Sequence, residues 1–155
     1  MDTVLESDMA HAFLTPSNAG MTATDTQKHA VYVVAKQMSQ ACSPEDYALA
    51  LARHFLSHYP LVSKAKVTVE AAPWRRAAVA GRPHAHGFML EGGGLRTAHA
   101  EVDRAGAAEV TAGVRDMRVL KTTQSGYSGF LHDALTVLPD VAERMVATAV
   151  TATWR

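Results

Sequence analysis

The most informative part of the chain runs from Val119 to Arg155 and reads VLKTTQSGYSGFLHDALTVLPDVAERMVATAVTATWR. Its polar residues follow neither the period of two of a half-buried strand nor the 3.6-residue period of an amphipathic helix. Strands are predicted on both sides of this polar segment, at Met117–Lys121 and Met145–Trp154. We therefore interpret the segment between these strands as a binding loop.

Two segments upstream carry helix signals. Thr24 and Gln27 have the Thr-x-x-Gln spacing in which a hydroxyl and an amide satisfy each other's backbone donors, and apolar residues follow at helical spacing as far as Met38. The β-branched residues of Ala30–Val34 favour a strand, so both interpretations stay open. The second signal is stronger, because Ser43 can cap a helix that has Pro44 at its first position.

The second helix is predicted to run to about His58. Tyr47, Leu51 and Phe55 recur at intervals of four, which places them on one buried stripe. Tyr59-Pro60 ends the pattern, because a residue before proline is disfavoured in the helical region. A helix of this kind needs a sheet or another helix to cover its apolar stripe.

The remaining elements are predicted as strands. A short strand is expected at Ser7–Thr15, and Ala65–Ala71 alternates apolar with polar residues, as in a sheet with one wet face. Two segments, Pro83–Leu90 and Leu95–Asp103, flank Gly92–Gly94 and are predicted to form a hairpin. A strand, two helices and then several strands give an α+β class without a βαβ rhythm.

Bulk composition limits the class of protein. A chain of 155 residues with 48% hydrophobic and 19% charged residues is expected to fold as one compact domain. Lys plus Arg and Asp plus Glu are equal at 15 each, so no global basic field attracts nucleic acid or an anionic membrane. The single cysteine, Cys42, and an acidic N-terminus without a signal peptide pattern predict a cytoplasmic protein.

An ordered set of short motifs resembles the uricase (urate oxidase) family over roughly Ser7 to Arg155. The set reads TDTQK, PW-R, G-x-PHAHGF, VLKTTQSGY and LP-x-V-x-x-R along the chain. The resemblance implies the tunnelling fold, an antiparallel sheet with two helices on one face. It also implies a first fold unit at residues 1–144, short of its first strand, and the opening strand of a truncated second unit at residues 145–155.

The resemblance assigns substrate-binding roles to Tyr127 and Arg144. In the uricase motif an arginine lies seventeen positions after an aromatic residue that stacks on urate, and Tyr127 and Arg144 have this spacing. A planar guanidinium suits an acceptor edge because it donates two parallel hydrogen bonds. Composition alone favours a surface arginine paired with Asp140 or Glu143. Tyr127 stands where the family usually has phenylalanine.

Thr24 and Asp25 match the family's Thr-Asp pair. The resemblance implies that this pair contacts urate and the oxygen or water site from a neighbouring subunit, with Thr24 as a catalytic residue. A helix cap alone is the plainer reading, and the two are compatible. A threonine hydroxyl is a very weak base, so it needs a nearby amine or imidazole. In uricases these helpers are a lysine on the first strand and a histidine in the second half, and here no lysine precedes Lys28.

The expected activity is the cofactor-free oxidation of urate by dioxygen to 5-hydroxyisourate and hydrogen peroxide. No cofactor and no metal are implied, and the expected partners are urate, dioxygen and further copies in a homo-oligomer, a tetramer in the family. Departures from the family pattern stand at His29, where asparagine is usual, and at His132, where arginine or lysine is common.

Two alternatives remain. A truncated, catalytically incomplete assembly or binding module of the same fold is the first, because exposed sheet edges pair readily with other chains. A metal-binding protein is the second and rests on His84 and His86, which share one face of a strand, together with His99.

Overall fold

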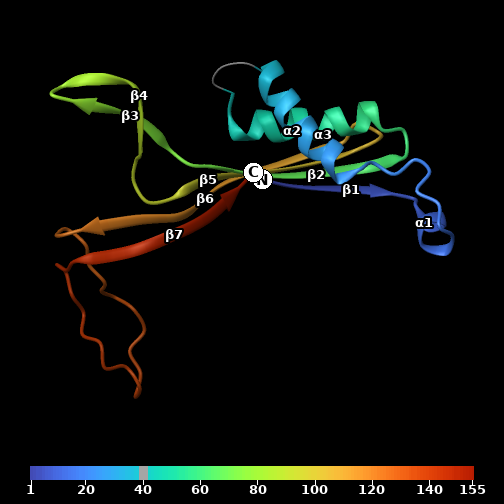
Figure 1. Cartoon of the computed structure of the whole chain (residues 1–155). Coiled ribbons are helices and arrows are strands. Elements are labelled where there is room, and N and C mark those ends of the chain that lie inside the picture. The colour runs from blue at the N-terminus through green and yellow to red at the C-terminus, as the bar shows by residue number, and fades with distance from the viewer. Residues whose placement is uncertain (39–41) are drawn as a thin grey trace.

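A computed structural model describes residues 1–38 and 42–155 and has an α+β architecture (Figure 1). A five-stranded antiparallel sheet has the order β1-β2-β5-β6-β7, and a separate two-stranded sheet pairs β3 with β4. Helices α2 and α3 cover one face of the larger sheet. The bounds are β1 Asp2–Ser7, α1 Ala10–Leu14, α2 Thr24–Met38, α3 Pro44–His58, β2 Val62–Ala71, β3 Trp74–Val79, β4 Arg82–Leu90, β5 Leu95–Asp103, β6 Ala108–Lys121 and β7 Val146–Trp154.

Helix α3 confirms its sequence signals. The Ser43 side chain accepts a hydrogen bond from the backbone nitrogen of Asp46 at 3.0 Å, and Pro44 occupies the first turn. The predicted stripe of Tyr47, Leu51 and Phe55 is buried. Because this stripe packs on β2 and β5, α3 is the helix that fixes the core.

Strand β2 also follows its pattern. Ala65, Val67 and Val69 are buried toward the helices, whereas Lys64 and Lys66 lie on the opposite face. On that face Lys64 pairs with Glu101 of β5, and the hydrogen bond from Lys64 is the main reason that the pKa of Glu101 is lowered. The sheet thus has one apolar face under the helices and one face with ion pairs.

Helix α2 forms as predicted, but its start differs. The backbone nitrogen of Gln27 donates to the carbonyl of Ala23 at 3.1 Å, so Ala23 takes the cap position and Thr24 is the first helical residue. The predicted capping box is therefore wrong. The Gln27 side-chain oxygen instead accepts from the Thr3 hydroxyl of β1 at 3.2 Å, which ties the helix to the sheet edge.

Two packing contacts position α2 beside α3. Ala30 and Val34 are its buried residues. The Tyr47 hydroxyl of α3 donates to the Val31 carbonyl of α2 at 2.7 Å. Burial, followed by the nearby Cys42, raises the pKa of Tyr47. Helix α2 is thereby held against α3 by the hydrogen bond from Tyr47 and by the buried side chains of Ala30 and Val34.

The predicted strand at Ser7–Thr15 is wrong. The strand ends at Ser7, and Ala10–Leu14 forms the short helix α1. Strand β1 pairs with β2 from Asp2, opposite Thr68, to Ser7, opposite Val62. Because β2 begins at Val62, residues after Ser7 have no partner in the ladder, and the extended segment stops there.

The predicted hairpin around Gly92–Gly94 is also wrong. Strand β4 pairs with β3, and β5 pairs with β2 and β6. The turn of the real hairpin is Ala80-Gly81, where both residues have positive φ angles of 50° and 75°. Such turns match the twist of two antiparallel strands. The triple glycine instead carries the chain from the small sheet to the large one.

Strands β6 and β7 form a long ribbon that extends beyond the rest of the sheet (Figure 1). Their register shifts between Val114 and Met117, and Asp116 has a positive φ of 57°. A bulge of this kind bends the strand that contains it. The ribbon therefore carries the segment between β6 and β7 away from the helices. Strand β7 agrees with the predicted strand, and its assignment to a second unit stays a prediction.

No helix within the described ranges 1–38 and 42–155 is long and apolar enough to cross a membrane. Cys42 lies between α2 and α3 and is exposed.

One testable consequence concerns His54 on α3. Burial, followed by the charge of His58, lowers the pKa of His54, and the two rings stack with centroids 4.0 Å apart. A lowered pKa in the folded state favours the neutral ring, so its stability contribution is present above the unfolded pKa of about 6.5 and is lost as pH falls through the folded pKa.

On acidification, the unfolding free energy of the variant His54→Gln is therefore expected to fall less than that of the parent. Urea unfolding measures this difference in the variant and the parent. It is carried out at two pH values, about one unit above and about one unit below the unfolded histidine pKa of roughly 6.5. An identical pH dependence in the two proteins would contradict the assignment.

Candidate functional site

The site is built on residues 122–145, which connect β6 to β7. The two arms of this loop are joined by backbone hydrogen bonds. Tyr127 donates to and accepts from Val141, at 2.7 and 2.9 Å, and the Arg144 nitrogen donates to the Ser125 carbonyl at 2.7 Å. Because the arms are antiparallel and close, Tyr127 and Arg144 are brought onto neighbouring stretches of backbone.

The base of the loop is fixed by side chains from both arms. The Gln124 nitrogen donates to the Glu143 carboxylate at 2.6 Å, and the Lys121 ammonium donates to the Gln124 carbonyl at 2.9 Å. Gln124 has a positive φ of 57°, a conformation that is uncommon for residues other than glycine. Backbone strain held by surrounding contacts is typical of binding sites.

Gly126 explains how closely the arms approach. A Cβ at this position would lie 3.0 Å from the Ala142 carbonyl oxygen and 3.1 Å from that of Val141. These neighbours are backbone atoms, so a side chain would push the arms apart. The close approach of the two arms therefore favours glycine immediately before Tyr127.

Tyr127 belongs to a stack of three rings. Its centroid lies 4.5 Å from that of Phe130 with an interplanar angle of 13°, and Phe130 lies 4.5 Å from His132 with an angle of 19°. The His132 Nε2 atom lies 3.1 Å from an oxygen of Asp140. Tyr127 is 50% exposed, so the stack covers one part of the ring and leaves another open to a ligand.

The Arg144 side chain is exposed. The acids with which a surface arginine was expected to pair have other partners, because Asp140 contacts His132 and Glu143 accepts from Gln124. Over residues 1–38 and 42–155, the Arg144 guanidinium takes part in no ion pair within 4.0 Å. Its donors are therefore available to an acceptor edge outside the loop.

The tip of the loop is held by a local turn. The Asp133 carboxylate accepts from the Leu135 nitrogen at 2.8 Å and from the Thr136 hydroxyl at 2.9 Å. These bonds, led by the one from Leu135, lower the pKa of Asp133. Large apolar side chains nearby are exposed, namely Leu131, Leu135 and Val137.

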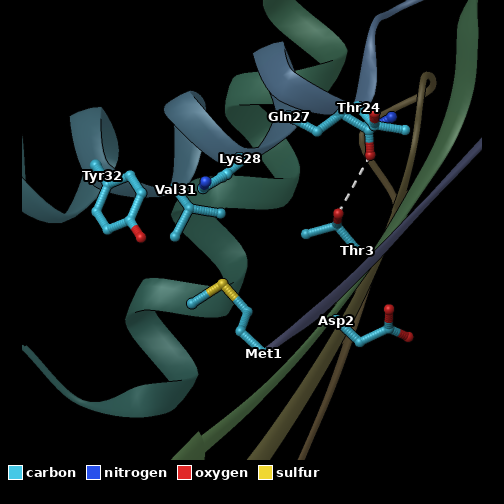
Figure 2. A pocket seen from close by; sticks show the side chains of 8 residues that line it. All are labelled: Met1, Asp2, Thr3, Thr24, Gln27, Lys28, Val31 and Tyr32. Carbon is cyan, nitrogen blue, oxygen red and sulfur yellow. Dashed lines mark hydrogen bonds between the residues drawn. The ribbon is translucent and has the colours of Figure 1, made fainter.

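Thr24 and Asp25 lie elsewhere, at the start of α2. Thr24 borders a cavity of about 390 Å³ between α2 and β1. Figure 2 shows the cavity with the Thr3 hydroxyl reaching toward the helix from β1. The lining residues are Met1, Asp2, Thr3, Thr24, Gln27, Lys28, Val31 and Tyr32. Asp25 points to solvent and pairs with His29 at 3.4 Å, so the His29 departure supplies a local partner.

One copy of the chain does not bring these two groups together. The loop 122–145 lies at the far end of the β6–β7 ribbon, whereas α2 lies over the other end of the sheet (Figure 1). The Tyr127–Arg144 pair and the Thr24–Asp25 pair thus form two separate halves of the candidate site.

The structure does not place the three histidines of the metal alternative in one sheet. His84 and His86 lie on β4 and His99 lies on β5, in two separate sheets. The His84 Nδ1 atom accepts from the Gly87 nitrogen at 2.7 Å, and the His99 ring contacts the Thr68 hydroxyl at 3.0 Å. Within the part of the chain that the structure describes, no group of three or more His, Cys, Asp or Glu side chains is arranged to hold a metal ion.

Sequence reasoning missed the ring support and most of the cavity. Phe130 was not singled out and Asp140 was considered only as a partner of Arg144, although the aromatic positions 127, 130 and 132 were a visible signal in YSGFLH. The cavity residues of β1 carried no signal, since that strand was not predicted at Asp2–Ser7.

The Uricase family model matches residues 5–101 and 110–155. The chain belongs to the uricase family. It is 46% identical to Uricase-2 isozyme 2 of Canavalia lineata over 97% of this chain and 50% of that protein, and 38% identical to the Uricase of Danio rerio over 92% of this chain and 48% of that protein. It thus spans about half the length of the curated uricases it matches.

Solved uricases share its fold. The uricase from Arthrobacter globiformis matches with a TM-score of 0.77 and 30% identity, over 99% of this chain and 52% of that chain. The urate oxidase mutant R298C from Bacillus sp. TB-90 matches with a TM-score of 0.81 and 18% identity, over 99% and 53%. The uricase resemblance and the α+β tunnelling fold predicted from the sequence are therefore confirmed.

Proposed function

We propose that this chain contributes to a cofactor-free oxidation of urate by dioxygen that yields 5-hydroxyisourate and hydrogen peroxide. The observation that carries the proposal is the loop 122–145, which presents two groups on its joined arms: a half-exposed Tyr127 ring and an Arg144 guanidinium that forms no ion pair with the described residues 1–38 and 42–155. A flat purine monoanion needs both a stacking face and a fork of donors. Family membership supports this substrate, since the relatives are uricases.

The reaction balances without any further oxidant. Urate gives two electrons to dioxygen, which leaves as hydrogen peroxide after taking up two protons, and water supplies the hydroxyl group that is added to the purine. In this scheme Tyr127 stacks on the ring and Arg144 holds its acceptor edge. The protein's contribution is orientation and charge stabilisation of a bound anion.

We assign Thr24 and Asp25 to the same site from a neighbouring copy. In a single chain they lie on the opposite part of the fold from the loop (Figure 1), and a symmetric dimer gives two such shared sites. Thr24 is the group placed to pass protons, with the help of an amine or imidazole, because its hydroxyl alone is too weak a base.

A shared site predicts complementation between two inactive variants. Arg144→Ala and Thr24→Ala are each expected to abolish most urate turnover. Mixed hetero-oligomers regain one intact site per mixed dimer, so random pairing at equal amounts restores about one quarter of the parent activity in a two-fold symmetric interface. Mixtures that stay inactive although the two variants exchange subunits would contradict a shared site.

Turnover itself is tested by ultraviolet absorbance of urate together with peroxide detection. The chain is assayed alone and as a fusion to the half of the Canavalia lineata uricase that it does not span, and the oligomeric size is measured in the same samples. Urate loss with matching peroxide in the fusion supports the proposal. A folded, oligomeric fusion without turnover would overturn it.

An assembly module without catalysis is the second candidate. Among the described residues, the outer edges of β1 and β7 in the five-stranded sheet have no partner strand, and Val4 and Trp154 on these strands are exposed. Unpaired edges of this kind are association surfaces. Oligomers that neither bind nor oxidise urate, in the chain alone and in the fusion, would favour this candidate.

A further inference from the structure

We propose that Phe130, His132 and Asp140 are positioning residues that hold the Tyr127 ring flat for a planar aromatic ligand. The inference rests on the proposed function, since it deepens the role of the same loop. None of the three residues needs to touch the ligand. They act through the ring of Tyr127. Their contacts form a closed series, here called the circuit, that runs from the Tyr127 ring through Phe130, His132 and Asp140 to the Tyr127 backbone.

The first part of the circuit is the ring stack. A tyrosine ring has few constraints when half of it faces solvent, and Tyr127 is 50% exposed. Phe130 covers one side of it with near-parallel planes, and His132 lies against Phe130 in the same way. Stacked aromatic pairs are favourable beyond the area that they bury. The orientation of Tyr127 therefore depends on rings further along the loop.

The second part of the circuit fixes the end of the stack. The His132 Nε2 atom lies 3.1 Å from the Asp140 carboxylate. Asp140 precedes Val141, whose backbone exchanges two hydrogen bonds with Tyr127. The other carboxylate oxygen of Asp140 accepts from the Gly129 nitrogen at 3.4 Å. The series of contacts thus begins at the Tyr127 ring and ends at the backbone of the same residue, which is hydrogen-bonded to Val141.

The contacts of His132 show which kinds of side chain could replace it. A planar histidine meets both requirements of the circuit, because it stacks on Phe130 and pairs with Asp140. An arginine meets both as well, since its guanidinium is planar and forms ion pairs. A lysine meets only the second, because an ammonium group offers no flat face.

The test compares His132→Ala, His132→Arg and His132→Lys with Leu131→Ala as the matched control. Leu131 adjoins His132 in the loop, is 88% exposed and lies outside the stack. The first readout needs no urate: the ring-proton shifts of Tyr127 by NMR, assigned through the signal that disappears in Tyr127→Phe. The second readout is kcat and KM for urate in the active form of the protein.

Loss of the stack is expected in the alanine and lysine variants and not in the arginine variant or the control. The Tyr127 signals should move toward those of a free tyrosine, and KM should rise about three- to tenfold with little change in kcat, as expected for the loss of one aromatic contact that acts on binding. Recovery by arginine but not by lysine separates a flat stacking group from a charge alone.

Two results would overturn the inference. One is a His132→Ala variant with unchanged Tyr127 signals and unchanged KM, and the other is recovery by lysine as complete as that by arginine. Failure of the parent protein to bind urate would remove the proposed function, while the Tyr127 signals would still decide whether the stack holds the ring.

Discussion

Replacing Arg144 with alanine is expected to lower kcat/KM for urate by about two to four orders of magnitude, because two hydrogen bonds from a charged donor are lost and each is worth about 1.5–3 kcal/mol. The guanidinium is exposed and forms no ion pair within the described residues 1–38 and 42–155, so in the proposed role the change removes a ligand contact without breaking an internal ion pair. Arg144→Lys keeps the charge and loses the fork, so its loss is expected to be smaller than that of alanine.

The measurement is steady-state urate oxidation by the parent, Arg144→Ala, Arg144→Lys and Arg118→Lys. Arg118 is the matched control, since it lies on β6 of the same ribbon and is exposed. Thermal unfolding of each variant checks that the loop change has not altered the fold. A kcat/KM for Arg144→Ala within threefold of the parent would remove this residue from the site.

Local signals explain which parts of the fold the sequence predicted. Helix α3 was correct because its cap at Ser43, its proline and its apolar stripe all lie within the helix itself. Strand β2 was correct because its alternation reports the two faces of the sheet directly. Such signals need no knowledge of distant partners.

The sequence-based predictions were wrong where the pairing of strands decides the structure. The end of β1 at Ser7 is set by the start of β2 at Val62, more than fifty residues later. The hairpin was misplaced because Gly92–Gly94 is a conspicuous turn signal, whereas Ala80-Gly81 lacks the usual Asn-Gly or Asp-Gly pair. Neither fact can be obtained from a local pattern.

The candidate site shows the same division. The spacing of Tyr127 and Arg144 was recognisable as a family motif, and the joined arms give it a structural reason. The contact between His132 and Asp140 depends on how the loop folds back on itself, so no local pattern could pair these two residues in advance. The separation of Thr24 from the loop is likewise a property of the whole fold.

The largest effect on stability is expected from Phe55→Ala in α3. Phe55 is 0% exposed and belongs to the core between α3 and the strands β2 and β5. Removing a buried phenylalanine side chain costs about 3–5 kcal/mol, because its transfer energy is lost and a cavity remains. Net stabilities of single domains are only about 5–15 kcal/mol, so the variant should lose much of its margin or fail to fold.

Phe13→Ala supplies the matched comparison, since it is the same substitution at a side chain that is 90% exposed on α1. Its unfolding free energy should stay within about 0.5 kcal/mol of the parent, as is usual for surface positions. Urea unfolding at one fixed protein concentration measures both variants, because assembly makes apparent stability depend on concentration. A loss at Phe13 as large as that at Phe55 would mean that α1 is buried in the assembled protein and that subunit contacts, as well as the core under α3, hold the chain in its fold.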